Sequence, residues 1–198
     1  SIHSFPTRRS SDLANVEQRL VPGSLVLGQV SKINIHDIAL ALPNNLTGYV
    51  PLTSISGKLT ERVEKMVADD GASDDDTSSI GDDIDLNDLF TVGQYLRAFV
   101  VSTNESNASG AEVGKRRIEL SLQPQQANSG ITAKELAPNS MIMASVVSVE
   151  DHGLIMDIGL QQSAIGGFMS SKEIGYAVEM NTIQEGAVML CKIGRAHV

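Results

Sequence analysis

The sequence is poor in residues that mark several common protein classes. It contains no Trp, and the aromatic residues make up only 4% of its 198 residues. The single cysteine, Cys191, excludes an internal disulfide framework. Apolar runs of membrane-spanning length and a charged-then-apolar secretory start are also missing. We therefore expect an intracellular protein with neither a membrane span nor disulfides.

Signatures of catalysis are absent as well. The sequence has no G-x-S-x-G motif, no P-loop and no set of His, Asp and Glu at catalytic spacing. The adjacent pair Asp151 and His152 does not make a dyad, because neighbouring side chains on a strand point to opposite faces. No Cys or acid cluster accompanies the histidines at metal-ligand spacing. We expect no enzyme, and no metal, cofactor or small-molecule substrate.

One window of the chain carries acids without a single base. Residues 69–88 contain nine Asp and no Lys or Arg, in a chain whose formal charge is −9. The rest of the chain is therefore neutral, and its charge does not argue against nucleic-acid binding. The stretch 69–85 is polar, rich in Gly, Ser and Asp, and without period, which predicts a disordered insertion. It is interpreted as a solvated spacer, or else as a lure for basic proteins or a gate that repels RNA.

What the chain does contain is a series of short strands. The stretch Pro22–Ser54 predicts three of them, with turn chemistry at Pro43-Asn44-Asn45 and a bend at Gly28. A one-sided helix over 56–68 follows, and two further strands are expected at 94–102 and 115–122. Five tightly connected strands are typical of an antiparallel barrel of the oligonucleotide-binding (OB) type.

The pattern then restarts after residues 124–133, whose composition is typical of a linker. The repeat predicts an all-β chain of two tandem five-stranded OB-type barrels with short capping helices, the second barrel truncated after its fourth strand. Three pairs of strings align: Gly28-Gln29-Val30 with Ala144-Ser145-Val146, His36-Asp37 with His152-Gly153, and Gly48-Tyr49-Val50 with Gly167-Phe168-Met169.

These repeats set the expected domain boundaries. We expect a first domain at 20–123, with the insertion 69–85, and an incomplete second domain at 134–193. The ends, 1–19 and 194–198, are left out of the expected fold. The strings SIHSFPTRRSSDL and KIGRAHV have no strand or helix period and look like translated sequencing adapters.

The strings G-x-V, G-Y-V, V-G-Q-x-L-R-x-x-V and R-R-I-x-L-S-L together resemble the S1 RNA-binding domain family. They are carried by Gly28 and Val30, Gly48–Val50, Val92–Val100 and Arg116–Leu122. The resemblance implies an OB barrel on which single-stranded bases stack against aromatic rings while basic side chains meet phosphates. Within the family, PGSLVLGQV and LPNNLTGYVP resemble the N-terminal repeats of a eukaryotic multi-repeat protein of nucleolar pre-rRNA maturation. That likeness implies the nucleus and nucleolus, with single-stranded or structured pre-rRNA and other ribosome-assembly proteins as partners.

The resemblance also implies which residues bind RNA. The usual Phe before Gly on the second strand is replaced by His in both copies, and Ala39 and Ile155 stand at the second aromatic position. Pro51 and Ser170 replace the usual His of the third strand, so we expect a weak grip on RNA. The candidate RNA-binding residues are His36, Tyr49, Arg97, Lys115, Arg116, Arg117, His152 and Phe168.

Each candidate also has a plain structural interpretation. The two histidines would be satisfied strand residues, the two aromatic residues would be core, and Lys115-Arg116-Arg117 would be a solvated hairpin shoulder. Tyr95 and Phe99 alternate away from the apolar positions of the fourth strand, which indicates a protein-docking surface with Arg97 between them.

The sequence thus favours an RNA-binding scaffold module for pre-rRNA processing and ribosome biogenesis. Two alternatives stay open: a protein-interaction module with degenerate S1 barrels that do not bind RNA, and the accessory S1 region of an RNA-processing enzyme.

Overall fold

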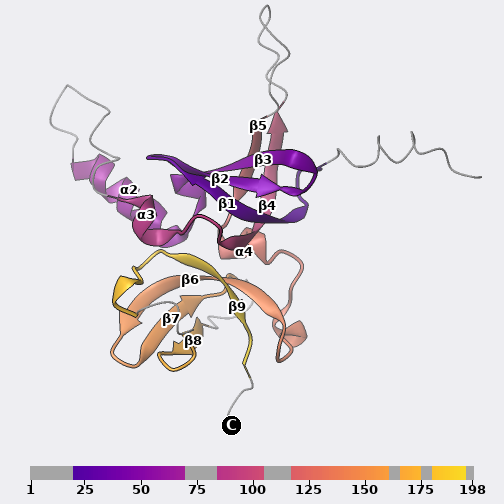
Figure 1. Ribbon diagram of the computed structural model, residues 1–198. Helices are drawn as coiled ribbons and strands as arrows, with labels where there is room; N and C mark the ends of the chain where they lie inside the picture. Colours follow the sequence, from indigo (N-terminus) through magenta and orange to yellow (C-terminus); the bar gives the residue numbers. More distant parts are fainter. Residues whose placement is uncertain (1–19, 70–83, 105–116, 161–165, 175–179, 195–198) are drawn as a thin grey trace, which may run out of the picture.

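The computed structural model describes residues 20–69, 84–104, 117–160, 166–174 and 180–194, which form two β-rich units stacked on one another (Figure 1). The first unit is a closed barrel of strand order β1-β2-β3-β5-β4, the order of a five-stranded OB barrel. Its strands are β1 (Leu25–Ile33), β2 (Asp37–Leu42), β3 (Leu46–Pro51), β4 (Tyr95–Asn104) and β5 (Arg117–Ser121).

The second unit is a four-stranded sheet, a half-barrel of strand order β8-β7-β6-β9. This confirms the predicted all-β architecture, in which a five-stranded barrel precedes a copy with four strands. Within the described residues, the outer edges of β8 and β9 pair with no further strand. The strands are β6 (Met141–Glu150), β7 (Gly153–Asp157), β8 (Gly166–Ser170) and β9 (Val188–Lys192).

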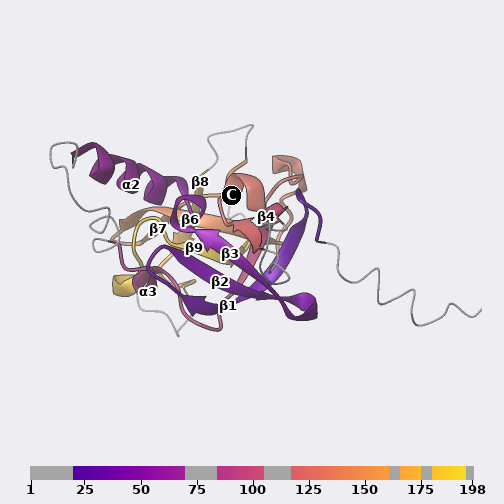
Figure 2. The ribbon, with the colours of Figure 1, turned by 90° about the horizontal axis from the view of Figure 1, so that it is seen from above.

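Short helices and turns fill the connections. The predicted one-sided helix is present: Leu59 is buried, and Val63 and Met66 pack against the core. Figure 2 shows this helix, α2, beside the barrel strands. The helices are α2 (Gly57–Asp69), α3 (Leu86–Leu89) and α4 (Pro124–Ala127), and the 3-10 turns are η1 (Pro43–Asn45), η2 (Leu52–Ser54), η4 (Ala133–Glu135) and η5 (Met180–Thr182).

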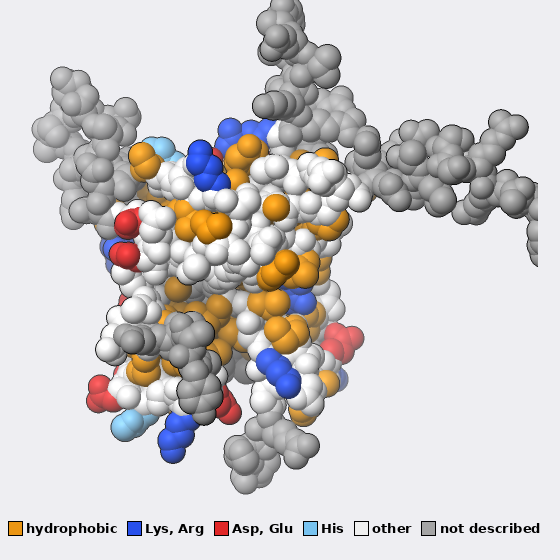
Figure 3. Space-filling view, in the orientation of Figure 1, with side chains coloured by type: hydrophobic (Ala, Val, Ile, Leu, Met, Phe, Trp, Pro, Cys, Tyr) orange, Lys and Arg blue, Asp and Glu red, His pale blue; other side chains and the backbone are white. Residues whose placement is uncertain are grey.

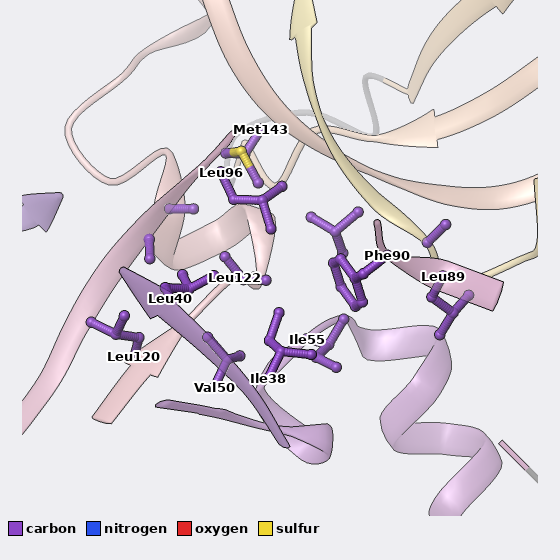
Figure 4. Packing of buried hydrophobic residues seen from close by; sticks show 14 of the residues in the cluster. Ile38, Leu40, Val50, Ile55, Leu89, Phe90, Leu96, Leu120, Leu122 and Met143 are labelled. Carbon is purple, nitrogen blue, oxygen red and sulfur yellow. The ribbon is translucent and has the colours of Figure 1, made fainter. Parts of the chain in front are cut away.

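Alternating apolar residues of the strands fill the barrel (Figure 4). Ile38, Leu40 and Val50 are fully buried, as are Leu96 and Leu120. Gly48 lies directly under Leu120, and a Cβ at this position would overlap the leucine Cδ1 atom. The glycine is therefore required because β5 packs tightly across β3.

The turn between β2 and β3 forms where the sequence predicts it. Asn44 and Asn45 adopt φ angles of 61° and 55°, a left-handed conformation that Asn tolerates better than most residues. The ladder irregularity of β1 lies between Val30 and Lys32, two residues beyond Gly28, where the bend was expected. At Gly28 the glycine allows close packing, because a Cβ there would meet Leu42 Cδ2 at 2.9 Å.

The backbone repeats the same details in both units. The ladder skips one residue of β1 after Val30, and one residue of β6 after the aligned Val146. The amide of Gly93 donates to the Val30 carbonyl at 2.8 Å, and the amide of Gly186 donates to the Val146 carbonyl at 2.8 Å. Both glycines have positive φ, 96° and 90°. The internal repeat seen in the sequence therefore extends to bulges and turns.

A single hydrophobic core runs through both units. Met143 of β6 is fully buried and lies beside Leu96 of the barrel (Figure 4). Ser56 at the barrel end donates from Oγ to the Gly186 carbonyl at 2.8 Å, and both Ser56 and Met143 are 0% exposed. Figure 3 shows hydrophobic side chains along this seam between the two units.

The segment expected to be a linker is part of the seam. It contains α4, in which Ala127 is fully buried, and the following Asn128 is 2% exposed. The Asn128 amide donates to the carbonyls of Met143 and Ile158 at 2.7 and 2.9 Å. Its Oδ1 accepts from the Met143 amide at 3.0 Å and from Nη2 of Arg97. The segment is thus packed structure instead of an extended connection.

Most of the acidic insertion, residues 70–83, lies outside the described residues, as do 1–19 and 195–198 at the ends. The described edges of the insertion are ordered: Ile84 is buried, and Asp85 caps α3 by accepting from the Asn87 amide at 2.8 Å. Among the described residues, no helix is long and apolar enough to cross a membrane.

Candidate nucleic-acid interface

The outer face of β2, β3 and β5 holds one stacked aromatic side chain. Tyr49 of β3 pairs with Ala39 of β2 on one side and with Glu119 of β5 on the other. Arg117, the first residue of β5, places its guanidinium carbon 5.2 Å from the centre of the Tyr49 ring. This distance falls within the range of a cation–π contact.

Asp37 holds the arginine in place. Its Oδ2 lies 3.6 Å from Nη2 of Arg117, and its Oδ1 accepts from the Asn34 side chain at 2.6 Å. Arg117 remains more than half exposed, so one part of the guanidinium is free to meet solvent or a ligand. Bases stack on Arg planes as well as on aromatic rings, so the Tyr49–Arg117 pair can receive a base on either member.

The second unit has an equivalent face with an exposed aromatic ring and, among the described residues, no basic side chain over it. Phe168 of β8 aligns with Tyr49 and is 63% exposed, and its strand partner Ile155 is 39% exposed. A Cβ added to Gly153 would lie 2.8 Å from Phe168 Cζ, which places the ring across this glycine. Gly153 aligns with Asp37, so one position binds an arginine in the first unit and supports a ring in the second. Within the described residues, no Lys or Arg lies over the Phe168 ring.

The two histidines occupy equivalent places in the two units. Both side chains are exposed. The His36 carbonyl accepts from the Leu52 amide at 2.9 Å, and the His152 carbonyl accepts from the Ser171 amide at 2.9 Å. Their backbones therefore fasten the turns that precede β2 and β7, while their side chains stay available at the edge of each face.

Arg97 lies at the seam, away from this face. Besides Asn128, its guanidinium contacts the Met141 carbonyl at 3.4 Å, and its backbone amide lies 3.4 Å from Met143 Sδ. Burial lowers the pKa of Arg97, and its Nε is buried without a partner among the described residues. In this arrangement Arg97 joins the two units, and its role in RNA binding stays a prediction.

The remaining candidates fall into two groups. Lys115 and Arg116 lie outside the described residues. Tyr95 and Phe99 point outward from β4, where they pair with Gln29 and Leu25 of β1. Tyr95 is 57% exposed and Phe99 is half-buried. They share this outer face with Leu27, which makes an apolar surface on the β1–β4 side of the barrel.

Sequence reasoning missed two residues that shape these sites, Asp37 and Asn128. Asp37 acts through Arg117, and their meeting depends on the pairing of β3 with β5, which no local pattern shows. Asn128 sits in a stretch without period, and only its burial reveals its role. Among the described residues, no group of three His, Cys, Asp or Glu side chains is arranged to hold a metal.

No protein-family model matches the chain. A solution structure of GSP13 from Bacillus subtilis superposes with a TM-score of 0.37 at 17% identity, covering 60% of this chain and 65% of that one.

Curated relatives match at higher identity. The chain is 42% identical over 179 residues to rRNA biogenesis protein rrp5 of Schizosaccharomyces pombe, a match that covers 89% of the chain and 10% of that protein. It is 30% identical over 157 residues to the human protein RRP5 homolog, covering 79% of the chain and 8% of that protein. The chain is therefore homologous to a short region of the RRP5 rRNA biogenesis proteins.

Proposed function

We propose that the chain is an RNA-binding scaffold module that acts in pre-rRNA processing in the nucleolus. The observation that carries the proposal is the Arg117 guanidinium stacked over Tyr49 on the outer face of the barrel. The name of the S. pombe relative, an rRNA biogenesis protein, supports pre-rRNA as the RNA.

Tyr49 and Arg117 would receive one base, and Phe168 would receive another. Each stacked base contributes about 1–3 kcal/mol to single-strand binding. The first unit adds the positive charge of Arg117 for the backbone, whereas Phe168 offers stacking alone among the described residues. We expect the first unit to bind RNA more strongly and with a steeper dependence on salt.

Anisotropy of a fluorescein-labelled, mixed-sequence single-stranded RNA of twelve nucleotides tests this function. Tyr49→Ala should weaken binding about 5- to 150-fold, the equivalent of one lost stacked base. Phe168→Ala should weaken it by less. Tyr95→Ala is the matched control, because this exposed tyrosine lies on the β1–β4 face and not beside Arg117.

Two outcomes would contradict the proposal: no binding by the parent protein at moderate salt, or equal loss from Tyr49→Ala and Tyr95→Ala. Circular dichroism and thermal melting should show that Tyr49→Ala remains folded, since the side chain is only half-buried.

A second candidate function, binding of other ribosome-assembly proteins, is favoured by the exposed apolar surface of β1 and β4. Leu25, Leu27 and Tyr95 lie there with large exposed fractions. Leu27→Asp combined with Tyr95→Asp should abolish such binding while leaving RNA affinity unchanged. Unchanged recovery of assembly proteins with this double variant would exclude the surface as their docking site.

A further inference from the structure

A cleft opens in the first unit beside the candidate nucleic-acid interface. Its volume is about 760 Å³. Residues 33–37, from the end of β1 to the start of β2, form one side, and residues 84–87 at the start of α3 form the other. Asp37 lines both the cleft and the Tyr49–Arg117 pair, so the two sites adjoin.

The walls of the cleft combine four apolar side chains with polar ones, among them Asn34, His36 and Asn87. Ile33 and Ile35 line it from the turn, while Ile84 and Leu86 line it from the α3 side. Ile84 and Leu86 are buried in the core and fix the floor, whereas Ile35 is 66% exposed. This fraction is the largest among the exposed large hydrophobic residues of the described chain. An apolar side chain at the rim of a cleft can bury its exposed surface against a ligand, which stabilises the bound state.

Two carboxylates, Asp37 and Asp85, also line the cleft. Asp37 is already engaged by Asn34 and Arg117. Asp85 accepts from the backbone and side-chain nitrogens of Asn87 at 2.8 and 2.7 Å, and both bonds use Oδ1. Oδ2 is therefore left for an incoming donor among the described residues. The hydrogen bonds from the Asn87 backbone and side chain lower the pKa of Asp85, which keeps it ionised at neutral pH.

The charge around the cleft selects the kind of ligand. The sequence has no Lys or Arg from residue 66 to residue 96, so nothing in this part of the chain neutralises Asp85. A polyphosphate strand would meet repulsion here, whereas a cation would be attracted. Lys and Arg combine an apolar stem with a charged head, which suits isoleucine walls beside an open carboxylate oxygen.

We propose that this cleft docks a Lys- or Arg-bearing segment of a partner protein. The apolar stem of the basic side chain lies along Ile35 and Ile33, and its charged head meets Oδ2 of Asp85. Binding at this cleft leaves the Tyr49–Arg117 pair free, so a basic protein and an RNA can occupy the first unit together.

The test uses a fluorescein-labelled hexapeptide, Leu-Arg-Leu-Lys-Leu-Arg, with Leu-Gln-Leu-Gln-Leu-Gln as the uncharged control. Ile35→Ala and Asp85→Asn should each weaken binding of the basic peptide at least fivefold. Both variants should fold, because Ile35 is exposed and Asn is also a good helix N-cap. Glu64→Gln is the matched control, since it removes one negative charge at an exposed position of α2 that does not line the cleft, and it should change affinity less than twofold.

Several results would overturn the proposal. Equal losses from Asp85→Asn and Glu64→Gln, or no loss from Ile35→Ala, would show general charge attraction in place of docking. Equal affinity for the two peptides would exclude recognition of a cation, and undetectable binding of the basic peptide would exclude the site. Displacement of the peptide by the twelve-nucleotide RNA would assign the cleft to the RNA surface instead. Anisotropy of the RNA with the Ile35→Ala variant, expected to be unchanged, keeps this result separate from the fate of the RNA-binding function.

Discussion

Removal of the Asn128 amide is expected to loosen the seam between the two units. This buried side chain uses both amide hydrogens and accepts two hydrogen bonds on Oδ1. Its partners are backbone groups of Met143 and Ile158 and the guanidinium of Arg97. In Asn128→Ala these groups lose their partners at a position that is buried in the parent protein.

The magnitude follows from the groups left behind. A buried polar group without a partner costs about 1–3 kcal/mol. Arg97 is charged, and among the described residues its Nε already has no partner. The cost of removing its hydrogen bond to Asn128 is therefore expected at the upper end of this range. Because water can enter the space left by the amide and satisfy some groups, we expect about 2–4 kcal/mol of lost unfolding free energy, less than the sum over all partners.

Urea unfolding followed by circular dichroism measures this loss. Ser129→Ala is the matched control, since Ser129 is the exposed neighbour in the same segment. The parent should unfold in one transition because the two units share a core, whereas Asn128→Ala should shift the midpoint or split the curve. A shift no larger than that of Ser129→Ala, or two separate transitions in the parent, would refute the idea that this side chain joins the units.

Three further outcomes are expected. Replacing residues 70–83 with a short Gly-Ser linker, which spares Ile84 and the Asp85 cap, should leave the melting temperature nearly unchanged and raise nonspecific RNA affinity at low salt; a large drop in melting temperature would contradict this. Burial raises the pKa of Cys191 to about 11, so its thiol should stay protonated and react slowly with Ellman's reagent at pH 8 until the protein is unfolded. Hydrogen exchange should be faster in β8 than in β3, because among the described residues β3 pairs with a strand on both sides and β8 on one side only. Strand β6 pairs on both sides, as β1 does, so these two strands should be equally protected from exchange.

The strands and the repeat were predictable because their signals are local. Alternation of apolar residues places Ile38, Leu40 and Val50 inside, and the structure confirms all three as buried. Turn chemistry at Asn44 and Asn45 fixes where β2 ends, because few other residues adopt that backbone conformation readily. Such features depend on a few neighbouring residues, so a single sequence reveals them.

The use of the outward-facing residues could not be read in the same way. Alternation along β4 correctly predicts that Arg97 points away from Leu96 and Ala98. It does not reveal that the second unit packs against Arg97, since Asn128 and Met141 come close to this side chain only in the folded chain. A four-residue helix such as α4 is also too short to leave a period in the sequence.

The seam changes how two weak RNA sites would act together. Sites joined by a flexible linker raise each other's effective concentration over a range of ligand lengths, whereas sites on a rigid body reward only ligands that fit their separation. Because Asn128 is buried and the two units share a core, the two sites here lie on a rigid body. In Figure 1, β3 lies on the upper side of the first unit and β8 on the lower side of the second, with the seam between them. A single RNA that stacks on both Tyr49 and Phe168 must therefore pass around the seam. Any preference among RNAs would then depend on the length and path of the strand as much as on its bases.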